Sequence, residues 1–242
     1  STSRGLGDVY KRQLLHLLLI ISLLASHHRR ILMAKNPRMA VLDFASREAK
    51  RSQYCSRAAV KLEQLLLKFP KVLSSLQKGK VVKCVDLGCH PGSWLQVLSR
   101  KIKKAEIYGF DLNEIESLES LKYVDVHRTR TFQCDVFESD ELMNSLQLDK
   151  NVNLLTSDMM AKTTGQNDAS ASHELAVRAF ELATKDLLAK DAHFVCKIFE
   201  SEETRALKME AKKAFASASL FRPDAVRKGS REIYMVGVGF KG

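Results

Sequence analysis

Short apolar runs alternate with amphipathic stretches along the chain from about residue 44 onward. The apolar runs predict strands at residues 81–89, 106–112, 131–137, 153–160, 193–199 and 231–240, with a weaker candidate at 219–223. Helical periodicity covers residues 45–69, 93–102, 173–188 and 202–216. No internal repeat is visible, so the pattern predicts one α/β unit.

Short strands separated by helices are typical of βαβ units in a mostly parallel sheet that is covered on both faces. Ligands of such sheets bind at the carboxyl ends of the strands. The polar residues that follow each strand should therefore face one another across a single cleft.

The first predicted strand ends in a glycine-containing loop, VDLGCHPGSW (85–94), in which Gly88 and Gly92 bracket a tight turn. A dinucleotide fingerprint needs glycine at position 90, where His90 stands, so a nicotinamide cofactor is disfavoured. A cofactor without phosphates does not need that close approach, and S-adenosylmethionine is the commonest such ligand of this fold. A plain strand-to-helix turn is the alternative.

Two aspartates follow the next two predicted strands. Asp111 lies 23 residues after Gly88, about the spacing at which an acidic group accepts hydrogen bonds from a ribose diol. Asp135, one strand further, is placed to accept from an adenine amino group. Either residue could instead cap a helix N-terminus.

Four charged residues are expected to meet at the same edge of the sheet. Asp158 and Lys197 lie at the ends of apolar strands, and Glu232 begins the last strand, which must run antiparallel to reach that edge. Lys61 borders an apolar helical stripe in CSRAAVKLEQLL (55–66), where a lysine usually keeps its ammonium in water. Two lysines and two carboxylates in one pocket would offset each other's desolvation.

The chain has 242 residues, of which 45% are hydrophobic, enough for one substantial core. Its net charge of +11 favours a polyanionic partner such as RNA, the alternative being a basic but uninvolved surface. The candidate phosphate contacts are Arg47, Lys50, Arg51, Arg57, Arg222, Arg227, Lys228 and Arg231.

The five cysteines form no C-x-x-C pair and no zinc pattern, so we expect no metal site. Four of them lie in or beside apolar, strand-like runs and are interpreted as small buried hydrophobic residues in a reducing compartment. They are Cys84, Cys89, Cys134 and Cys196.

The first 33 residues are expected to lie outside the fold. Residues 14–25 (LLHLLLIISLLA) resemble the apolar part of a signal peptide but are too short and interrupted for a membrane span. Residues 7–13 (GDVYKRQ) match the translated end of a sequencing adapter, so residues 1–13 are interpreted as a library artefact. The natural start would then be Met33 or Met39, and residues 34–242 would form a single domain.

Five ordered motifs resemble those of the FtsJ-type (RrmJ-like) ribosomal RNA 2′-O-methyltransferases. They are SRAAVKL (56–62), DLGCHPGSW (86–94), SDM (157–159), VCKIF (195–199) and SREIY (230–234). The resemblance covers residue 44 to the C-terminus, and FESEE (199–203) with FRPDAVRKGSREIY (221–234) favours a eukaryotic, plant- or alga-like branch. It implies a Rossmann-like fold whose mostly parallel, seven-stranded sheet has an antiparallel last strand.

The same resemblance implies the roles of individual residues. The catalytic tetrad of the family falls on Lys61, Asp158, Lys197 and Glu232, with Lys197 as the proton acceptor. The S-adenosylmethionine contacts fall on Gly88, Gly92, Trp94, Asp111, Asp135 and Asp158. Relatives commonly carry SDMAPN where this chain has SDMMAK (157–162), so Met160, Lys162 and the run 163–172 are expected to alter substrate access. His90 is a second departure and is expected to alter how the cofactor packs.

The resemblance thus implies 2′-O-methylation of RNA, with a uridine of large-subunit ribosomal RNA as the first choice. The alternatives are a transfer RNA 2′-O-methyltransferase of the same fold and a catalytically silent, RNA-binding ribosome assembly factor. Lys197 would take the proton of the weakly nucleophilic hydroxyl while its own amine is neutral. Whether Lys61 tunes Lys197 or holds the RNA is left open. We further expect a monomer without stable membrane association, inside the cell, in a mitochondrion or another organelle ahead of the nucleus or cytoplasm.

Overall fold

The computed structural model describes residues 37–78, 81–161 and 168–242. The leader expected within residues 1–33 lies outside this part of the chain, and so do Lys162 and residues 163–167 of the loop expected to alter substrate access.

The centre of the fold is a seven-stranded sheet with the order β3-β2-β1-β4-β5-β7-β6. The strands are β1 (Val82–Leu87), β2 (Ala105–Asp111), β3 (Thr129–Gln133), β4 (Val152–Ser157), β5 (Leu188–Phe199), β6 (Phe215–Phe221) and β7 (Glu232–Phe240). All neighbours pair in parallel except β7, which is antiparallel to both β5 and β6. The predicted fold class, including the antiparallel last strand, is confirmed.

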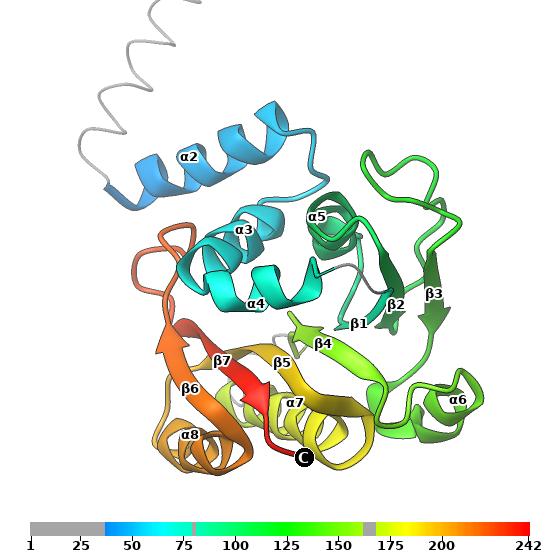
Figure 1. The fold of residues 1–242 in the computed structure, drawn as a ribbon. Coiled ribbons are helices and arrows are strands. Elements are labelled where there is room, and N and C mark those ends of the chain that lie inside the picture. The colour runs from blue at the N-terminus through cyan, green and yellow to red at the C-terminus, as the bar shows by residue number, and fades with distance from the viewer. Residues whose placement is uncertain (1–36, 79–80, 162–167) are drawn as a thin grey trace, which may run out of the picture.

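Helices cover both faces of this sheet (Figure 1). One face carries α3 (Ala58–Lys68), α4 (Pro70–Leu76) and α5 (Ser93–Lys101), with α2 (Pro37–Arg51) packed outside them, and the other carries α7 (Asp168–Glu181) and α8 (Glu203–Ala214). A short 3-10 turn, η1 (Val136–Glu138), and α6 (Asp140–Ser145) follow β3. Two apolar clusters fill the layers, one centred on residues such as Leu62 and Leu95 and the other on Phe194 and Phe215.

Some predicted boundaries are wrong because of local backbone turns. The single helix expected over residues 45–69 is two helices, since Gln53 adopts a positive φ of 57° and the Tyr54 amide closes α2 on the Ala49 carbonyl. The helix expected over 173–188 ends at Glu181 and continues as a π-helical turn, η2 (Leu182–Leu187). The strand β5 then begins at Leu188, five residues before the predicted start at residue 193. The strands β3 and β4 end before Asp135 and Asp158, so both aspartates stand in the loops that follow.

The break between α2 and α3 is held by Gln96, a buried residue of α5. Its Oε1 accepts from the Cys55 amide at 2.8 Å, and its Nε2 donates to the carbonyls of Gln53 at 3.2 Å and Lys122 at 2.9 Å. One buried side chain thus binds three backbone groups, two in the connection between α2 and α3 and one in the connection between β2 and β3. These three hydrogen bonds of Gln96 hold the connection that leads into α3, and α3 in turn positions Lys61.

All five cysteines are free thiols. Cys84, Cys89 and Cys196 are buried as expected, Cys134 is half-buried and Cys55 is exposed. Within residues 37–78, 81–161 and 168–242, no helix is long and apolar enough to cross a bilayer. The same residues contain no group of His, Cys, Asp and Glu side chains that could hold a metal ion.

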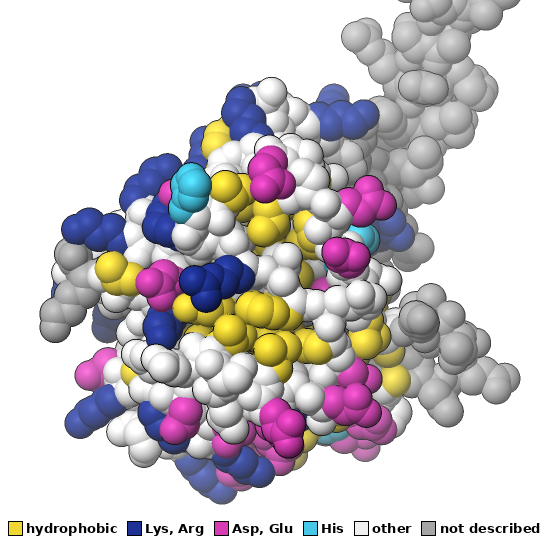
Figure 2. Space-filling model, turned by 90° about the vertical axis from the view of Figure 1, so that its right-hand side faces the viewer, with side chains coloured by type: hydrophobic (Ala, Val, Ile, Leu, Met, Phe, Trp, Pro, Cys, Tyr) yellow, Lys and Arg dark blue, Asp and Glu magenta, His cyan; other side chains and the backbone are white. Residues whose placement is uncertain are grey.

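The surface separates its charges. On the face drawn in Figure 2, apolar side chains form a band across the middle, Lys and Arg side chains gather mainly at the upper left, and Asp and Glu side chains lie mainly toward the right and below. On this face the basic and acidic side chains are therefore unevenly distributed.

Candidate active site

A cavity of about 960 Å³ opens at the carboxyl ends of the parallel strands. It lies where the strand order reverses, between β1 and β4, the usual ligand site of a doubly wound sheet. Its lining includes the four predicted catalytic residues, Lys61, Asp158, Lys197 and Glu232. Besides Asp158, which was predicted for both roles, it includes three further predicted cofactor contacts, Gly88, Asp111 and Asp135.

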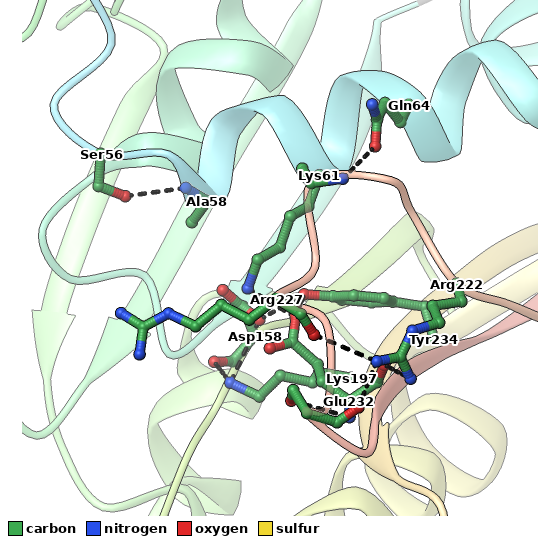
Figure 3. A network of polar contacts seen from close by, with 12 residues as sticks. Ser56, Ala58, Lys61, Gln64, Asp158, Lys197, Arg222, Arg227, Glu232 and Tyr234 are labelled. Carbon is green, nitrogen blue, oxygen red and sulfur yellow. Dashed lines mark hydrogen bonds and ion pairs between the residues drawn. The ribbon is translucent and has the colours of Figure 1, made fainter. Parts of the chain in front are cut away.

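Two lysine–carboxylate pairs form one side of the cavity (Figure 3). The Lys61 Nζ lies 2.6 Å from the Glu232 Oε1, which joins α3 to the start of β7. The Lys197 Nζ lies 3.2 Å from the Asp158 Oδ1, which joins β5 to the loop that follows β4. The side chains are 5% exposed for Lys197 and 16% for Asp158, so each charge depends on its partner for the solvation that it lacks.

Tyr234 connects the two pairs. Its hydroxyl lies 2.7 Å from the Glu232 Oε1 and 3.0 Å from the Asp158 Oδ1, and its single hydrogen is donated to one carboxylate at a time. Burial, the charges of both carboxylates and the hydrogen bonds raise the pKa of this phenol well above its usual value. The hydroxyl is therefore a neutral donor that links the four residues into one network.

The electrostatics of Glu232 follow from the same contacts. Burial acts to raise the pKa of this carboxyl, but the charge and hydrogen bond of Lys61, the hydroxyl of Tyr234 and the charge of Lys197 act against it, and the pKa lies below its ordinary value. Glu232 is thus an anion at neutral pH, held by Lys61.

Strand pairing brings these residues together. In the antiparallel β5–β7 pair, Phe199 stands opposite Glu232 and Lys197 opposite Tyr234. Side chains two apart on a strand share a face, so Glu232 and Tyr234 point to the same side. Tyr234 was not among the residues predicted from sequence, although its position two residues after Glu232 in SREIY is a signal that places it on the same face.

Lys197 has a hydrogen-bonding arrangement that suits a proton acceptor. Its Nζ donates to the backbone carbonyl of Asp158 at 2.7 Å and contacts the Oδ1 of the same residue at 3.2 Å. A neutral amine has two N–H bonds and one lone pair. These two acceptors take both N–H bonds of the neutral form and leave the lone pair for a third partner.

The other side of the cavity carries the two remaining aspartates. The carboxylate of Asp111 accepts from the amides of His90 at 3.0 Å and Asn113 at 2.8 Å and from the Asn113 side chain. Asp135 accepts from the Phe137 amide at 3.0 Å and so caps η1, the alternative raised from sequence. Each carboxylate offers about four lone-pair sites, so both keep acceptor capacity toward the cavity while their backbone bonds hold them in place.

Gly88, in the loop after β1, lies against Met159 in the loop after β4. Its φ is +77°, and a Cβ at this position would lie 2.8 Å from the Met159 backbone nitrogen. The turn and the contact both require glycine, which lets the loops that carry His90 and Asp158 lie side by side.

The structure places Gly92 and Trp94 behind the cavity wall and not in its lining. Gly92 has a φ of +107° at the N-cap of α5, and a Cβ there would lie 2.3 Å from the Leu121 Cδ1. Trp94 is 2% exposed, donates from Nε1 to the Ala58 carbonyl at 3.0 Å and packs beside Tyr234 with ring centroids 6.0 Å apart. Trp94 thus supports the site from behind, through the start of α3 and through Tyr234, and Gly92 shapes the turn that begins α5.

Asp86 is a buried carboxyl beneath the site that sequence reasoning did not single out. It is 0% exposed, its Oδ1 accepts from the Thr156 hydroxyl at 2.7 Å, and its Oδ2 has no hydrogen-bond partner. Burial raises its pKa to about 8, against the lowering effect of the Thr156 hydrogen bond. Asp86 is thus mainly a neutral acid at pH 7.

The fold and the site define a doubly wound α/β protein that binds a ligand at the switch point of its sheet. Comparison with known proteins narrows this class. The chain belongs to the FtsJ-like methyltransferase family, whose model matches residues 54–240. The family expected from sequence is confirmed, and with it a methyltransferase, while the plant- or alga-like branch stays a prediction.

Relatives and a solved structure agree with this placement. The chain is 34% identical over 213 residues to ribosomal RNA large subunit methyltransferase E of Bdellovibrio bacteriovorus, covering 86% of this chain and 100% of the relative. It is 36% identical over 204 residues to the protein of the same description in Anaeromyxobacter dehalogenans, covering 83% of this chain and 72% of the relative. A crystal structure described as a ribosomal RNA methyltransferase from Plasmodium falciparum superposes with a TM-score of 0.64 at 26% identity, covering 78% of this chain and 100% of that chain.

Proposed function

We propose that this protein transfers a methyl group from S-adenosylmethionine to a ribose 2′-hydroxyl of RNA, with a uridine of large-subunit ribosomal RNA as the acceptor. The observation that carries the proposal is a linked network in which Tyr234 joins Lys61, Glu232, Asp158 and Lys197, and these four charged residues line the same cavity as Asp111 and Asp135. The acceptor is supported by the relatives, which are described as large-subunit ribosomal RNA methyltransferases.

The cavity fits S-adenosylmethionine in size and in chemistry. A volume of about 960 Å³ is at the upper end of the range of small-molecule sites. Asp111 and Asp135 would accept from the ribose hydroxyls and the adenine amino group, beside the apolar side chains of Leu112 and Phe137, which are 57% and 51% exposed. When bound, the sulfonium compound supplies an electrophilic methyl group.

The protein's own contribution is to prepare the acceptor. A 2′-hydroxyl is a weak nucleophile, and its proton must leave as the oxygen–methyl bond forms. In its neutral form Lys197 takes that proton on the Nζ lone pair, since its two N–H bonds are directed at the carbonyl and carboxylate of Asp158. Holding the acceptor oxygen in line with the methyl group supplies a further share of the rate.

Lys61 supports this arrangement from a distance. Its Nζ neutralises Glu232, and Tyr234 links Glu232 to Asp158, which in turn orients Lys197. These contacts favour a positioning role for Lys61 within the network over direct capture of the RNA, the two alternatives that the sequence left open.

The experiment that tests the proposal is methyl transfer from radiolabelled S-adenosylmethionine to unmodified large-subunit ribosomal RNA and to ribosomal particles, followed by mapping of 2′-O-methyl sites. Lys197→Ala is expected to lower kcat by at least about a hundredfold, the lower range for general acid–base catalysis, with the cofactor Kd unchanged. Asp111→Ala is expected to weaken cofactor binding first. Lys190→Ala, an exposed lysine on the same strand, is the matched control.

Two outcomes would contradict this function. Methylation of transfer RNA in preference to ribosomal RNA would favour the transfer RNA enzyme of the same fold, since the same network serves either acceptor. Binding of RNA without any methyl transfer by the wild-type protein would favour the silent assembly factor.

A further inference from the structure

The cavity has room for a second group beside the cofactor. Its volume of about 960 Å³ is at the upper end of the range for a site that holds one small molecule. Asp111 and Asp135 follow β2 and β3, whereas the sheet continues past β1 to β4 and β5, where Asp158 and Lys197 line the same cavity. The space around Lys197 is therefore the part that would receive the acceptor nucleotide.

Two walls of different character enclose this acceptor part of the cavity. The wall on the α3 face of the sheet carries the basic side chains of Arg57, Lys61 and Arg227. The connection that holds Arg227 is tied to α3, because the Ala225 amide donates to the Gln64 Oε1 at 3.0 Å. The opposite wall is formed by the loop after β4 and by α7, which covers the other face of the sheet (Figure 1). Its apolar lining consists of Met160, Ala161, Ala171 and Leu175.

Met160 is the one member of this apolar lining that is exposed. It is 61% exposed, whereas Ala161, Ala171 and Leu175 are half-buried. A long apolar side chain thus stands free in a cavity whose other apolar lining on this wall is partly covered. It is also one of the residues that the sequence predicted to alter substrate access.

The backbone that carries Met160 is held in place next to Lys197. The Asp158 amide donates to the Leu87 carbonyl at 3.1 Å, and the Asp158 carbonyl accepts from the Lys197 Nζ at 2.7 Å. Met160 follows two residues later, a span of at most about 7 Å. The base of a nucleotide is joined to the ribose carbon next to the one that bears the 2′-hydroxyl. An acceptor hydroxyl at Lys197 therefore brings its base within reach of Met160.

The charges of the two walls orient the acceptor nucleotide. Glu174 is the acidic residue that α7 adds to the cavity lining, and in the described part of the chain its carboxylate has no ion pair. A carboxylate there repels a phosphate group, whereas an uncharged base carries no such penalty. The sugar–phosphate strand is thus favoured on the basic wall, and the base is favoured on the wall of Met160.

The adenine of the cofactor is the other flat ring that Met160 could cover. Its expected partners Asp135, Leu112 and Phe137 follow β2 and β3, which lie on the far side of β1 from β4. Met160 follows β4, which is paired with the strand that carries Lys197. The strand order therefore places Met160 on the acceptor side of the cavity.

We propose that Met160 is the contact residue for the base of the acceptor nucleotide, with its thioether against the flat face of the ring. The proposal rests on the proposed function for the identity of the acceptor. Methionine is unbranched and polarizable and makes favourable contacts with aromatic rings, and unstacked RNA bases are commonly held by their faces. Such a contact recognises a planar base that has left its stack, and it does not read the hydrogen-bonding edge.

The first test compares Met160→Ala with Met209→Ala, a matched control on α8 that is 51% exposed and does not line the cavity. The substrates are short RNAs that span the mapped site and carry uridine, the non-planar dihydrouridine or an abasic nucleotide at the acceptor position. We expect the wild type to prefer uridine to either analogue in kcat/KM. Met160→Ala should lower kcat/KM for uridine about twofold to tenfold, the range of a thioether–ring contact, and should lose about the same factor of that preference. The cofactor Kd and the control variant should be unchanged.

A second measurement observes the contact without any activity. The methionine methyl groups are labelled with ¹³C, and the resonance of Met160 is identified by its loss in Met160→Ala. With S-adenosylhomocysteine bound, addition of the uridine RNA should shift this resonance through the ring current of the base. The abasic RNA should leave it in place, and the Met209 resonance should not move with either RNA. A short oligouridylate replaces these RNAs if no acceptor site is mapped.

The outcomes separate this inference from the proposed function. If the wild type methylates RNA while Met160→Ala keeps the full preference for uridine and the resonance stays in place, the base contact is wrong and the activity stands. If S-adenosylhomocysteine alone shifts the resonance and the variant raises the cofactor Kd, Met160 covers the adenine and the base contact is wrong. If the wild type methylates no RNA but oligouridylate shifts the resonance, the proposed function fails and the base contact stands. If neither is observed, both are wrong.

Discussion

At the scale of single residues, the site depends on charges that are buried in pairs. Lys61 is 9% exposed and is within 2.6 Å of Glu232, so the helix residue that sequence alone would leave in water is matched to an anion. Removing either member leaves the other without its counter-charge, which costs more than the pair contributes.

Lys61→Ala should therefore lower kcat strongly while the protein stays folded. We expect a fall of about tenfold to a hundredfold, because Glu232 loses its cation and the Tyr234 hydroxyl is drawn toward that uncompensated carboxylate and away from Asp158. The free energy of unfolding should drop by about 1 to 3 kcal/mol. Steady-state kinetics and urea unfolding measure both, with Lys68→Ala on the exposed side of the same helix as control. A variant that is destabilised but keeps its kcat would contradict this prediction and would show that Lys61 has only a structural role.

Asp86 makes a pH-dependent contribution with a defined sign. Its pKa is about 8 in the folded protein and near 4 in the unfolded chain, so between these values the folded state binds more protons. The contribution of Asp86 to the free energy of unfolding therefore decreases as the pH rises, by up to about 1.4 kcal/mol per pH unit.

Asp86→Asn should remove this slope, because the amide is neutral throughout. The difference in unfolding free energy between the variant and the wild type is expected to grow in the variant's favour from pH 5 to pH 7.5, by urea unfolding. Asp149→Asn, at an exposed position, should show no such trend. A difference that is independent of pH would show that Asp86 is ionised in the folded state.

At the scale of elements, one histidine joins three of them. The His193 Nε2 on β5 lies 2.5 Å from the Ser75 hydroxyl of α4, and the Nδ1 accepts from the Gly239 amide of β7 at 3.2 Å. Nδ1 can accept only while the ring is neutral. Burial lowers the pKa of His193 to about 4, partly offset by Asp191.

His193 changes the free energy of unfolding with pH in the opposite direction to Asp86. Between pH 6.5 and about 4 the unfolded chain binds a proton that the folded protein excludes, so the free energy of unfolding decreases as the pH falls, by up to about 3 kcal/mol in all. His193→Gln should lose this part of the pH dependence in urea unfolding, whereas the surface variant His127→Gln should retain it. Equal pH profiles for wild type and His193→Gln would contradict the neutral, buried ring.

At the scale of the whole molecule, the predicted domain can be tested by truncation. The described fold begins with α2 at Pro37, and its core clusters begin at Ala45. We propose that residues 34–242 form a single methyltransferase domain, and we expect removal of residues 1–33 to leave kcat and the melting temperature unchanged. A loss of RNA affinity in the truncated protein would give the basic N-terminal segment a functional role, and a lower melting temperature would extend the domain.

Much of this architecture follows from local patterns. The apolar runs and amphipathic stretches predict the strands and most helices, because burial on a sheet or on one helix face demands those periods. The ordered polar residues at the strand ends predict Asp158, Lys197 and Glu232 as one group, and Lys61 joins them from the helical motif SRAAVKL. The sequence did not predict the turn at Gln53 or the early start of β5, because neither carries a glycine or proline that would mark a break.

What the sequence determined by itself is thus the class of fold and the chemical types at the edge of the sheet. The tertiary structure decided which lysine pairs with which carboxylate, that Tyr234 links the pairs, that Trp94 and Gly92 stand behind the wall, and that Arg222 braces a loop while Arg227 faces the cavity. The physical reason is that pattern and propensity act over a few residues, whereas pairing, burial and charge compensation join positions up to 171 apart, as between Lys61 and Glu232.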